Sequence, residues 1–239
     1  MDMNTNITIH RVAKSTLPLY QFFGSTFPVG GFQHSYGLET YIAEGIVHNA
    51  KQLKEYLFHV LRQVYITFDG RAFCKASHYG GCVDLSELLK LDQEVTAMRL
   101  TKESRQASLK TGRAFLRMAS AITSDPVFED YWKTVQKQPD IGNYCIAVGF
   151  LMGRIKQPEQ EALRAYYFND LNNLLQVGVK TIPLGQTEGQ MLLYELYSEI
   201  ENAVMETIQE QQEELQNFVP YMNLMSMRHE ILYSRLYMS

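Results

Sequence analysis

Three side chains able to bind a metal, Cys74, His78 and Cys82, follow one another at intervals of four residues. On one continuous helix this spacing places two thiols and an imidazole on the same face, a donor set suited to a soft transition metal. Gly80 and Gly81 are expected to break that helix before Cys82. Free cysteine is also among the residue types most often buried without any ligand role. A helical metal carrier with Cys and His ligands therefore stays open as an alternative to a pair of structural thiols.

Known catalytic motifs are incomplete in this chain. His229 and Glu230 begin like the H-E-x-x-H helix of zinc proteases, but Tyr233 occupies the second histidine position. No G-x-S-x-G nucleophile elbow occurs. The glycine-rich loop from Gly24 to Phe32 lacks the G-x-x-x-x-G-K-[ST] pattern that binds phosphates. We therefore expect no enzymatic activity and no cofactor. Two function classes remain open from the residues alone. The chain is either an interaction protein, or an enzyme or metal carrier whose site is assembled from scattered residues.

The elements that would position these residues are predicted to be helices. The clearest apolar run follows Asn49, which forms a predicted capping box with Gln52, and it comprises Leu53, Leu57, Val60, Leu61, Val64 and Phe68. Further helices are predicted from Asp84, over Thr101 to Ile122, from Pro126, from Pro158 and over Gln186 to Gln209. No strand alternation of useful length appears. We predict an all-α fold, a single-domain bundle of about eight to ten helices over residues 1–239.

Composition narrows the class of protein. An apolar fraction of 46% and a charged fraction of 20% are ordinary for a globular chain, and a net charge of −4 argues against nucleic-acid binding. The first residues, MDMNTNITIHRV, do not resemble a signal peptide. The apolar stretch from Ile141 to Gly153 is too short to span a membrane, although its Gly149 and Gly153 would let a neighbouring helix approach closely. Three cysteines without CxxC spacing suit a reducing compartment. We expect a cytoplasmic protein that binds neither nucleic acid nor membrane.

Charge is distributed unevenly along the chain. Residues Thr181 to Met227 include eight Glu and no Asp, Lys or Arg, whereas Arg99 to Arg117 carries six basic residues against Glu103. Solvated helix faces explain such runs, and so does a charge-complementary docking surface. Both interpretations stay open.

The last segment, Met222 to Ser239, combines apolar and polar residues in a pattern unlike a frayed end. Chain ends are usually disordered unless other groups hold them, and soluble proteins rarely expose a large apolar patch. We therefore predict that residues 220–239 form a docking segment, which binds its own chain, a partner, or both. Residues 1–13 are predicted to form an N-terminal arm.

Three motifs resemble the urease accessory protein family UreF over about residues 15–239. The sequences SMRHE at 226–230 and LYSRL at 232–236 resemble the UreF C-terminus. The sequences PVGGF at 28–32 and SYGLE at 35–39 resemble its N-terminal signature, and PLGQTEGQ at 183–190 resembles a corner between two helices. Glu188 replaces an expected Asp, Lys180 an expected Arg, and Asn143 an expected His.

This resemblance implies an all-α, dimeric accessory factor for nickel insertion into urease. Such a protein would bridge the accessory protein UreD, called UreH in some systems, and the GTPase UreG. The assembly would deliver nickel to apo-urease. Whether the UreF-like chain also regulates GTP hydrolysis by UreG stays open.

The resemblance also implies two sets of partner-binding residues. The first is expected at the UreD interface, with the two arginines as its main contributors: Met227, Arg228, His229, Glu230, Ser234 and Arg235. The second is expected near another partner surface or the dimer seam: Pro28, Gly30, Gly31, Phe32, Gly185, Gln186 and Gln190. Whether the second set only shapes corners of the chain stays open.

Overall fold

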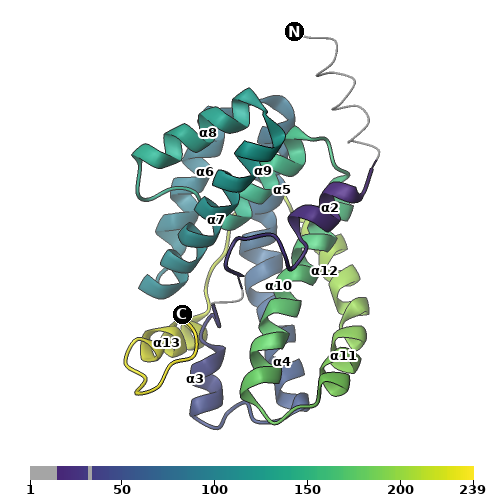
Figure 1. Cartoon of the computed structure of the whole chain (residues 1–239), viewed down its shortest axis with the longest axis vertical. Coiled ribbons are helices and arrows are strands. Elements are labelled where there is room, and N and C mark those ends of the chain that lie inside the picture. The colour runs from purple at the N-terminus through teal and green to yellow at the C-terminus, as the bar shows by residue number, and fades with distance from the viewer. Residues whose placement is uncertain (1–14, 32–33) are drawn as a thin grey trace.

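Helices account for all regular elements in the computed structural model, which describes residues 15–31 and 34–239 (Figure 1). In chain order these are α2 (Leu17–Phe22), α3 (Leu38–Ala43), α4 (Ala50–Val60), the π-helix η2 (Leu61–Asp69), α5 (Gly70–Cys82), α6 (Leu85–Met98), α7 (Lys102–Thr123), α8 (Pro126–Lys137), α9 (Tyr144–Arg154), α10 (Glu159–Thr181), α11 (Gln186–Glu195), α12 (Tyr197–Gln209) and α13 (Pro220–His229). The predicted all-α fold is confirmed. The predicted arm at residues 1–13, and Phe32, lie outside the described residues.

Several helix starts lie where local sequence predicts them. The Asn49 side chain accepts a hydrogen bond from the Gln52 N–H, and the Gln52 side chain accepts one from the His48 N–H. Asp84 and Asp125 cap α6 and α8 in the same way. These caps satisfy backbone donors that the first helical turn leaves unpaired.

Three details of the helix prediction are wrong. The helix expected over Gln186 to Gln209 is interrupted at Leu196, which separates α11 from α12. The sequence predicts a cap at Thr187 or Gln186, but Gly185 stands at the N-cap of α11 without a side-chain cap. Helix α5 continues through Gly80 and Gly81 to Cys82. The described chain forms ten helical segments if α4, η2 and α5, which are continuous, are counted as one and if α11 and α12, which only Leu196 divides, are also counted as one.

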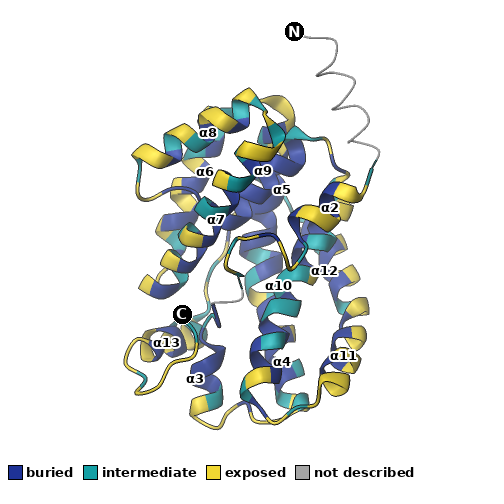
Figure 2. Cartoon of the chain, in the orientation of Figure 1, coloured by how far each residue is buried: buried dark blue, intermediate teal, exposed yellow. Residues whose placement is uncertain are grey.

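Helix α9 packs against α5 at the centre of the fold, where buried residues are concentrated (Figure 2). An added Cβ at Gly153 would lie 1.9 Å from the Ser77 carbonyl oxygen, and one at Gly149 would lie 2.4 Å from the Phe73 carbonyl oxygen. The predicted close approach at these two glycines is therefore confirmed. Gly80 on α5 allows the same close approach from the other helix, since an added Cβ there would lie 2.3 Å from the Phe150 carbonyl oxygen of α9.

A buried carboxylate holds the start of α9. Asp92 accepts hydrogen bonds from the Tyr131 hydroxyl at 2.5 Å, the Gly142 N–H at 2.6 Å and the Asn143 N–H at 3.0 Å. The Asn143 side chain also donates to Asp92 and accepts from the Ser108 hydroxyl. Asn143, where the resemblance predicts histidine, thus satisfies buried polar groups at this helix end.

Half of the glutamates between Thr181 and Met227 form ion pairs with other helices of the same chain. The four pairs are Glu195–Lys54, Glu201–Arg164, Glu206–Arg62 and Glu210–Arg71. The acidic run therefore serves in part as a charge-complementary surface within the fold. Within the described residues, no helix is both long enough and apolar enough to cross a membrane.

The segment between α12 and α13 is fixed to the π-helix. The Thr67 carbonyl accepts a hydrogen bond from the Gln216 N–H at 3.0 Å, and the Thr67 hydroxyl donates to the Gln216 carbonyl at 2.9 Å. Arg71 donates to the Glu214 carbonyl. This anchored segment fixes the position at which α13 begins.

Candidate functional site

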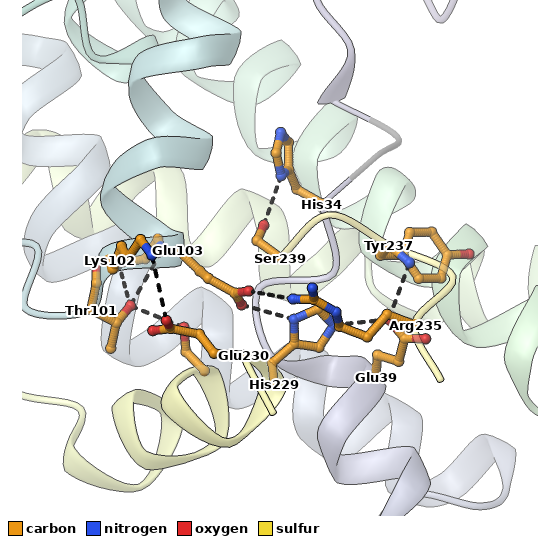
Figure 3. A network of polar contacts seen from close by, with 12 residues as sticks. His34, Glu39, Thr101, Lys102, Glu103, His229, Glu230, Arg235, Tyr237 and Ser239 are labelled. Atoms are coloured by element: carbon orange, nitrogen blue, oxygen red, sulfur yellow. Dashed lines mark hydrogen bonds and ion pairs between the residues drawn. The ribbon is translucent and has the colours of Figure 1, made fainter. Parts of the chain in front are cut away.

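His229, the last residue of α13, lies fully buried between two glutamates (Figure 3). Its Nε2 lies 2.9 Å from a Glu39 carboxylate oxygen, and its Nδ1 lies 2.8 Å from a Glu103 carboxylate oxygen. A neutral imidazole can donate only one hydrogen bond, whereas an imidazolium donates two. Both contacts are hydrogen bonds only if the ring carries two protons, and such charge-assisted bonds are the stronger kind.

The same two carboxylates also bind the chain after α13. Glu39 accepts from the Leu236 N–H at 2.7 Å and from the Tyr237 N–H at 3.2 Å, and Glu103 accepts from Arg235 at 3.2 Å. Glu39 lies in the first turn of α3 and Glu103 in the first turn of α7, where the helix dipole favours a negative charge. We call His229, Glu39, Glu103 and Arg235 the tail network, and residues 220–239 the tail.

Further contacts connect the tail with the N-terminal signature. The Ser239 carbonyl accepts from the Ser35 N–H, and the Ser239 hydroxyl lies 2.7 Å from His34 Nδ1. Gly37 has a φ of +89°, a conformation that favours glycine. An added Cβ there would also lie 3.3 Å from the Ser226 nitrogen, which is a tight contact. Burial and Lys110 lower the pKa of His34 to about 4, which keeps this imidazole neutral at pH 7.

The tail also reaches the end of α10. Burial raises the pKa of Tyr237, while the nearby side chain of Thr181, two residues before the corner that begins at Pro183, lowers it in part. The tail therefore contacts the N-terminal signature directly and lies beside the third motif.

The predicted tail residues divide between an inner and an outer face. His229 is fully buried and contacts only its own chain. Arg228 forms an exposed ion pair with Glu44 at 2.7 Å, and Glu230 lies 3.9 Å from Lys102. Arg235 reaches Glu103, as described above. Met227 and Ser234 are exposed.

The second predicted set occupies two places along α10. Gly31 lies against Asn173 in the middle of α10, with Pro28 and Gly30 exposed on the same loop. Gly185, Gln186 and Gln190 are exposed at the corner after α10, and Gly185 has open space around it and a negative φ. The fold itself does not require glycine at Gly185.

Sequence reasoning missed the most exposed apolar side chains of the tail. Tyr233 is fully exposed and Ile231 is 83% exposed, and Leu236 and Met238 are also open to solvent. It also missed the role of Glu39 and Glu103, whose partner is more than a hundred residues away. One signal in the sequence could have indicated the exposed side chains: the apolar residues after His229 do not fall on one face of a helix, so a helix could not bury all of them.

The proposed metal ligands of α5 do not come together. Cys74 is buried and burial raises its pKa well above the ordinary value, whereas His78 and Cys82 are exposed. Each step of four residues rotates a side chain by about 40° around a helix, so this row turns from the core to solvent. Among the residues that the structure describes, no group of three His, Cys, Asp or Glu could hold a metal ion.

Two small cavities lie on either side of Asp170 and share part of their lining. One, of about 70 Å³, is roofed by Met222, Asn223 and Ser226 of α13, and the second, of about 10 Å³, lies towards the loop before α3. Both are lined by Tyr36, Tyr144, Asp170 and Leu174. Burial raises the pKa of Asp170 to about 8, and the nearby Asp69 carboxylate adds to this shift. Asp170 therefore holds a proton at pH 7.

We expect Asp170→Asn to remove a pH dependence of stability. The folded state keeps the Asp170 proton up to about pH 8, while the unfolded chain releases it near pH 4, so this contribution is complete below pH 4 and is lost as pH rises through 8. At about 1.4 kcal/mol per pKa unit, the variant should exceed wild type by about 2 kcal/mol or more at pH 8.5. Urea unfolding from pH 5 to 8.5 measures this, with the exposed Asp140→Asn as control. Parallel profiles for wild type and Asp170→Asn would contradict the assignment.

Comparisons with known proteins agree with the sequence motifs. The profile of the UreF family matches residues 47–197. Three similar proteins, each named urease accessory protein UreF, come from Actinobacillus pleuropneumoniae serotype 3, Bacillus sp. TB-90 and Haemophilus influenzae PittGG. Their identities are 33%, 30% and 29%, over 90%, 93% and 97% of this chain and 94%, 98% and 99% of the relatives.

The fold is all-α, and the similar proteins are accessory proteins of urease. The chain belongs to the UreF family of urease accessory proteins. The predicted resemblance is thereby confirmed.

Proposed function

We propose that this chain is a non-catalytic urease maturation factor of the cytoplasm. It binds a UreD (UreH) protein and the GTPase UreG, and the assembly helps to deliver nickel to apo-urease. Family membership supports the general role. The observation that carries the proposal is the tail, whose inner face is held by the buried contacts of His229 with Glu39 and Glu103 while its outer face exposes Ile231, Tyr233, Leu236 and Met238.

The outer face of the tail is the proposed UreD-binding surface. Exposed apolar groups of this size are uncommon on soluble proteins unless a partner covers them. Tyrosine is also enriched among residues whose truncation costs about 2 kcal/mol or more at interfaces. Because the tail network already orders this segment, less conformational entropy is lost on binding than for a disordered tail.

The remaining tail residues take different parts in this proposal. Met227 and Ser234 contact UreD directly. Arg228, Glu230 and Arg235 lie at the rim, where charges contribute more to orientation and association rate than to affinity. His229 acts from inside, by holding the segment in place.

The homodimer is proposed to form along α2, α10, α11 and α12. This surface surrounds a groove of about 630 Å³ and carries exposed Tyr20, Phe168, Met191, Tyr194 and Tyr197. Gly185 is the N-cap of α11, and Gln186 and Gln190 lie in its first turns, so we place these three residues at this seam. We place Pro28, Gly30, Gly31 and Phe32 at a contact with UreG. Light scattering of the purified chain tests the dimer, and a mass of one chain contradicts it.

This chain would regulate GTP hydrolysis by UreG if it binds one nucleotide state of the GTPase more tightly than the other. A binding protein shifts such an equilibrium only by the difference between its affinities for the two states. GTP turnover by UreG, measured with and without a saturating amount of this chain, tests that part. Unchanged turnover at saturation contradicts it.

The maturation role is tested in cells that lack their own UreF gene. Supplying this chain, together with the UreD, UreG and urease of its own organism, should restore nickel-dependent urease activity. If activity stays at the level of cells without any UreF protein, the proposed function is wrong.

A further inference from the structure

A second groove lies between α4, the loop after α3 and the segment that enters α13. Its volume is about 500 Å³. Aromatic rings form much of its lining, namely Tyr41, Tyr56, Tyr221 and Phe218. The groove is separate from the tail network and from the surface along α10 to α12.

The three tyrosine rings pack on one another as a fixed unit. The centroids of Tyr41 and Tyr56 lie 5.1 Å apart at an interplanar angle of 62°, and those of Tyr41 and Tyr221 lie 5.5 Å apart at 75°. Tyr41 and Tyr56 are almost buried, whereas Tyr221 is half exposed. Burial, with Tyr221 nearby, raises the pKa of Tyr41 to about 12, so this ring stays neutral.

One carboxylate, that of Glu55, lines the groove. Glu55 lines it from α4 and is exposed, and it forms no ion pair within the described part of the chain. No Lys or Arg lines the groove, and His59, one turn beyond Glu55, is the only lining residue able to become cationic. Gln52 and Gln63 add amide carbonyls as acceptors. A neighbouring lysine on α4, Lys54, is already paired with Glu195.

We infer that this groove binds an arginine side chain presented by a partner protein. A guanidinium stacks on aromatic faces and forms paired hydrogen bonds with a carboxylate, which matches the tyrosine unit beside Glu55. The aliphatic part of the arginine would contact Ile46 and Phe218, which are exposed at the groove. An acidic segment would be repelled by Glu55, and a purely apolar segment would leave this carboxylate without a partner.

A protein is the fitting source of the arginine because the groove adjoins the tail. Residues 218–222 form one wall of the groove and run directly into α13. A partner seated on the tail could therefore extend into this groove, and this step rests on the proposed function. Recognition of the guanidinium itself depends only on the groove.

Titration with N-acetyl-arginine amide tests the groove without any partner. The neutral isostere N-acetyl-citrulline amide serves as comparison, and NMR of ring-labelled tyrosines reports binding. We expect the Tyr41, Tyr56 and Tyr221 signals to shift saturably with the arginine amide, and at least about fivefold more weakly with the citrulline amide. Glu55→Gln should lower the affinity about fivefold, while Glu94→Gln, an exposed glutamate on α6, should not change it. Equal shifts from the two amides, no shift from either, or an unchanged affinity in Glu55→Gln would overturn the inference.

Affinities for purified UreD and UreG then show whether a partner uses the groove. Glu55→Gln and Tyr221→Leu should each weaken one of these complexes about fivefold or more, with Glu94→Gln and Phe58→Leu as matched controls. Phe58 lies on the same helix but does not line the groove. If both groove variants bind both partners as wild type does, the groove does not serve this assembly and the inference is wrong in its partner. If wild type itself binds neither protein, the proposed function fails, and the amide titration alone decides on the groove.

Discussion

Replacing His229 with alanine is expected to release the tail and to lower the free energy of unfolding by about 3–5 kcal/mol. The imidazole contacts the buried carboxylates of Glu39 and Glu103, and its removal leaves one oxygen of each carboxylate without this buried partner. Urea unfolding measures the loss, and hydrogen exchange of residues 222–239 measures the release. Ser234→Ala, an exposed change in the same segment, should leave both unchanged.

A combined variant separates lost charge pairing from lost packing. Adding Glu39→Gln and Glu103→Gln to His229→Ala removes the two carboxylate charges that lost the imidazole, so a part of the lost stability should return, reduced by the loss of the Arg235–Glu103 ion pair. If His229→Ala keeps wild-type stability and wild-type exchange in the tail, the tail network does not hold the tail.

Gly153→Ala is expected to destabilise the fold strongly, because its new methyl group meets the backbone of a neighbouring helix. The new Cβ would lie 1.9 Å from the Ser77 carbonyl oxygen of α5, so α5 and α9 would have to separate. Overpacking of a core typically costs about 1–3 kcal/mol, and contact with rigid backbone places this variant at about 3 kcal/mol or above. Urea unfolding monitored by circular dichroism measures the effect.

Gly81→Ala provides the matched control for that substitution. Gly81 lies in α5, one residue after Gly80, and no atom lies within 4 Å of its added Cβ. Alanine there should raise stability by up to about 1 kcal/mol, because it lowers the entropy of the unfolded chain and favours the helix. Equal effects of the two substitutions would contradict the packing described for α5 and α9.

Local sequence predicted the features that local chemistry determines. The cap at Asn49 and the helix starts at Asp84 and Pro126 follow from the sequence because the hydrogen bonds that cap these helices span three residues. The close approach at Gly149 and Gly153 was also predicted, although not its partner helix.

Features that depend on distant contacts were missed or misjudged. Gly80 and Gly81 suggested a helix break, yet α5 continues because Gly80 is needed where α9 packs against it. The π-helix from Leu61 to Asp69 has no signature in the apolar period, and its Thr67 carbonyl is bound by Gln216 from far along the chain.

The candidate site shows the same division. The tail was predicted to dock, but Glu39 and Glu103 could not be assigned as its partners because they lie in other helices. Arg228 and Arg235 are predicted to be the main contributors to the UreD interface, and the structure shows that each has a carboxylate partner within the chain. Which tail residues face inward and which face outward could be assigned only from the exposed fraction of each side chain in the structure.

This division also shows which variants test the tail. Deleting residues 222–239 would remove buried Met225 and His229 together with the exposed residues, and a lost complex could then reflect damage to the fold. Substitutions on the outer face avoid this problem, since Tyr233 is fully exposed and Leu236 is 72% exposed.

The central claim is that the outer face of the tail binds UreD while its inner face holds the segment in place. Size-exclusion chromatography with light scattering, on this chain mixed with UreD and UreG of the same organism, tests it most directly. The account predicts a stable complex of the three proteins with wild type. With Tyr233→Ser and Leu236→Ser combined, it predicts loss of UreD, although helical circular dichroism and the unfolding midpoint stay unchanged. A complex of the same composition and stability with this double variant would contradict the account.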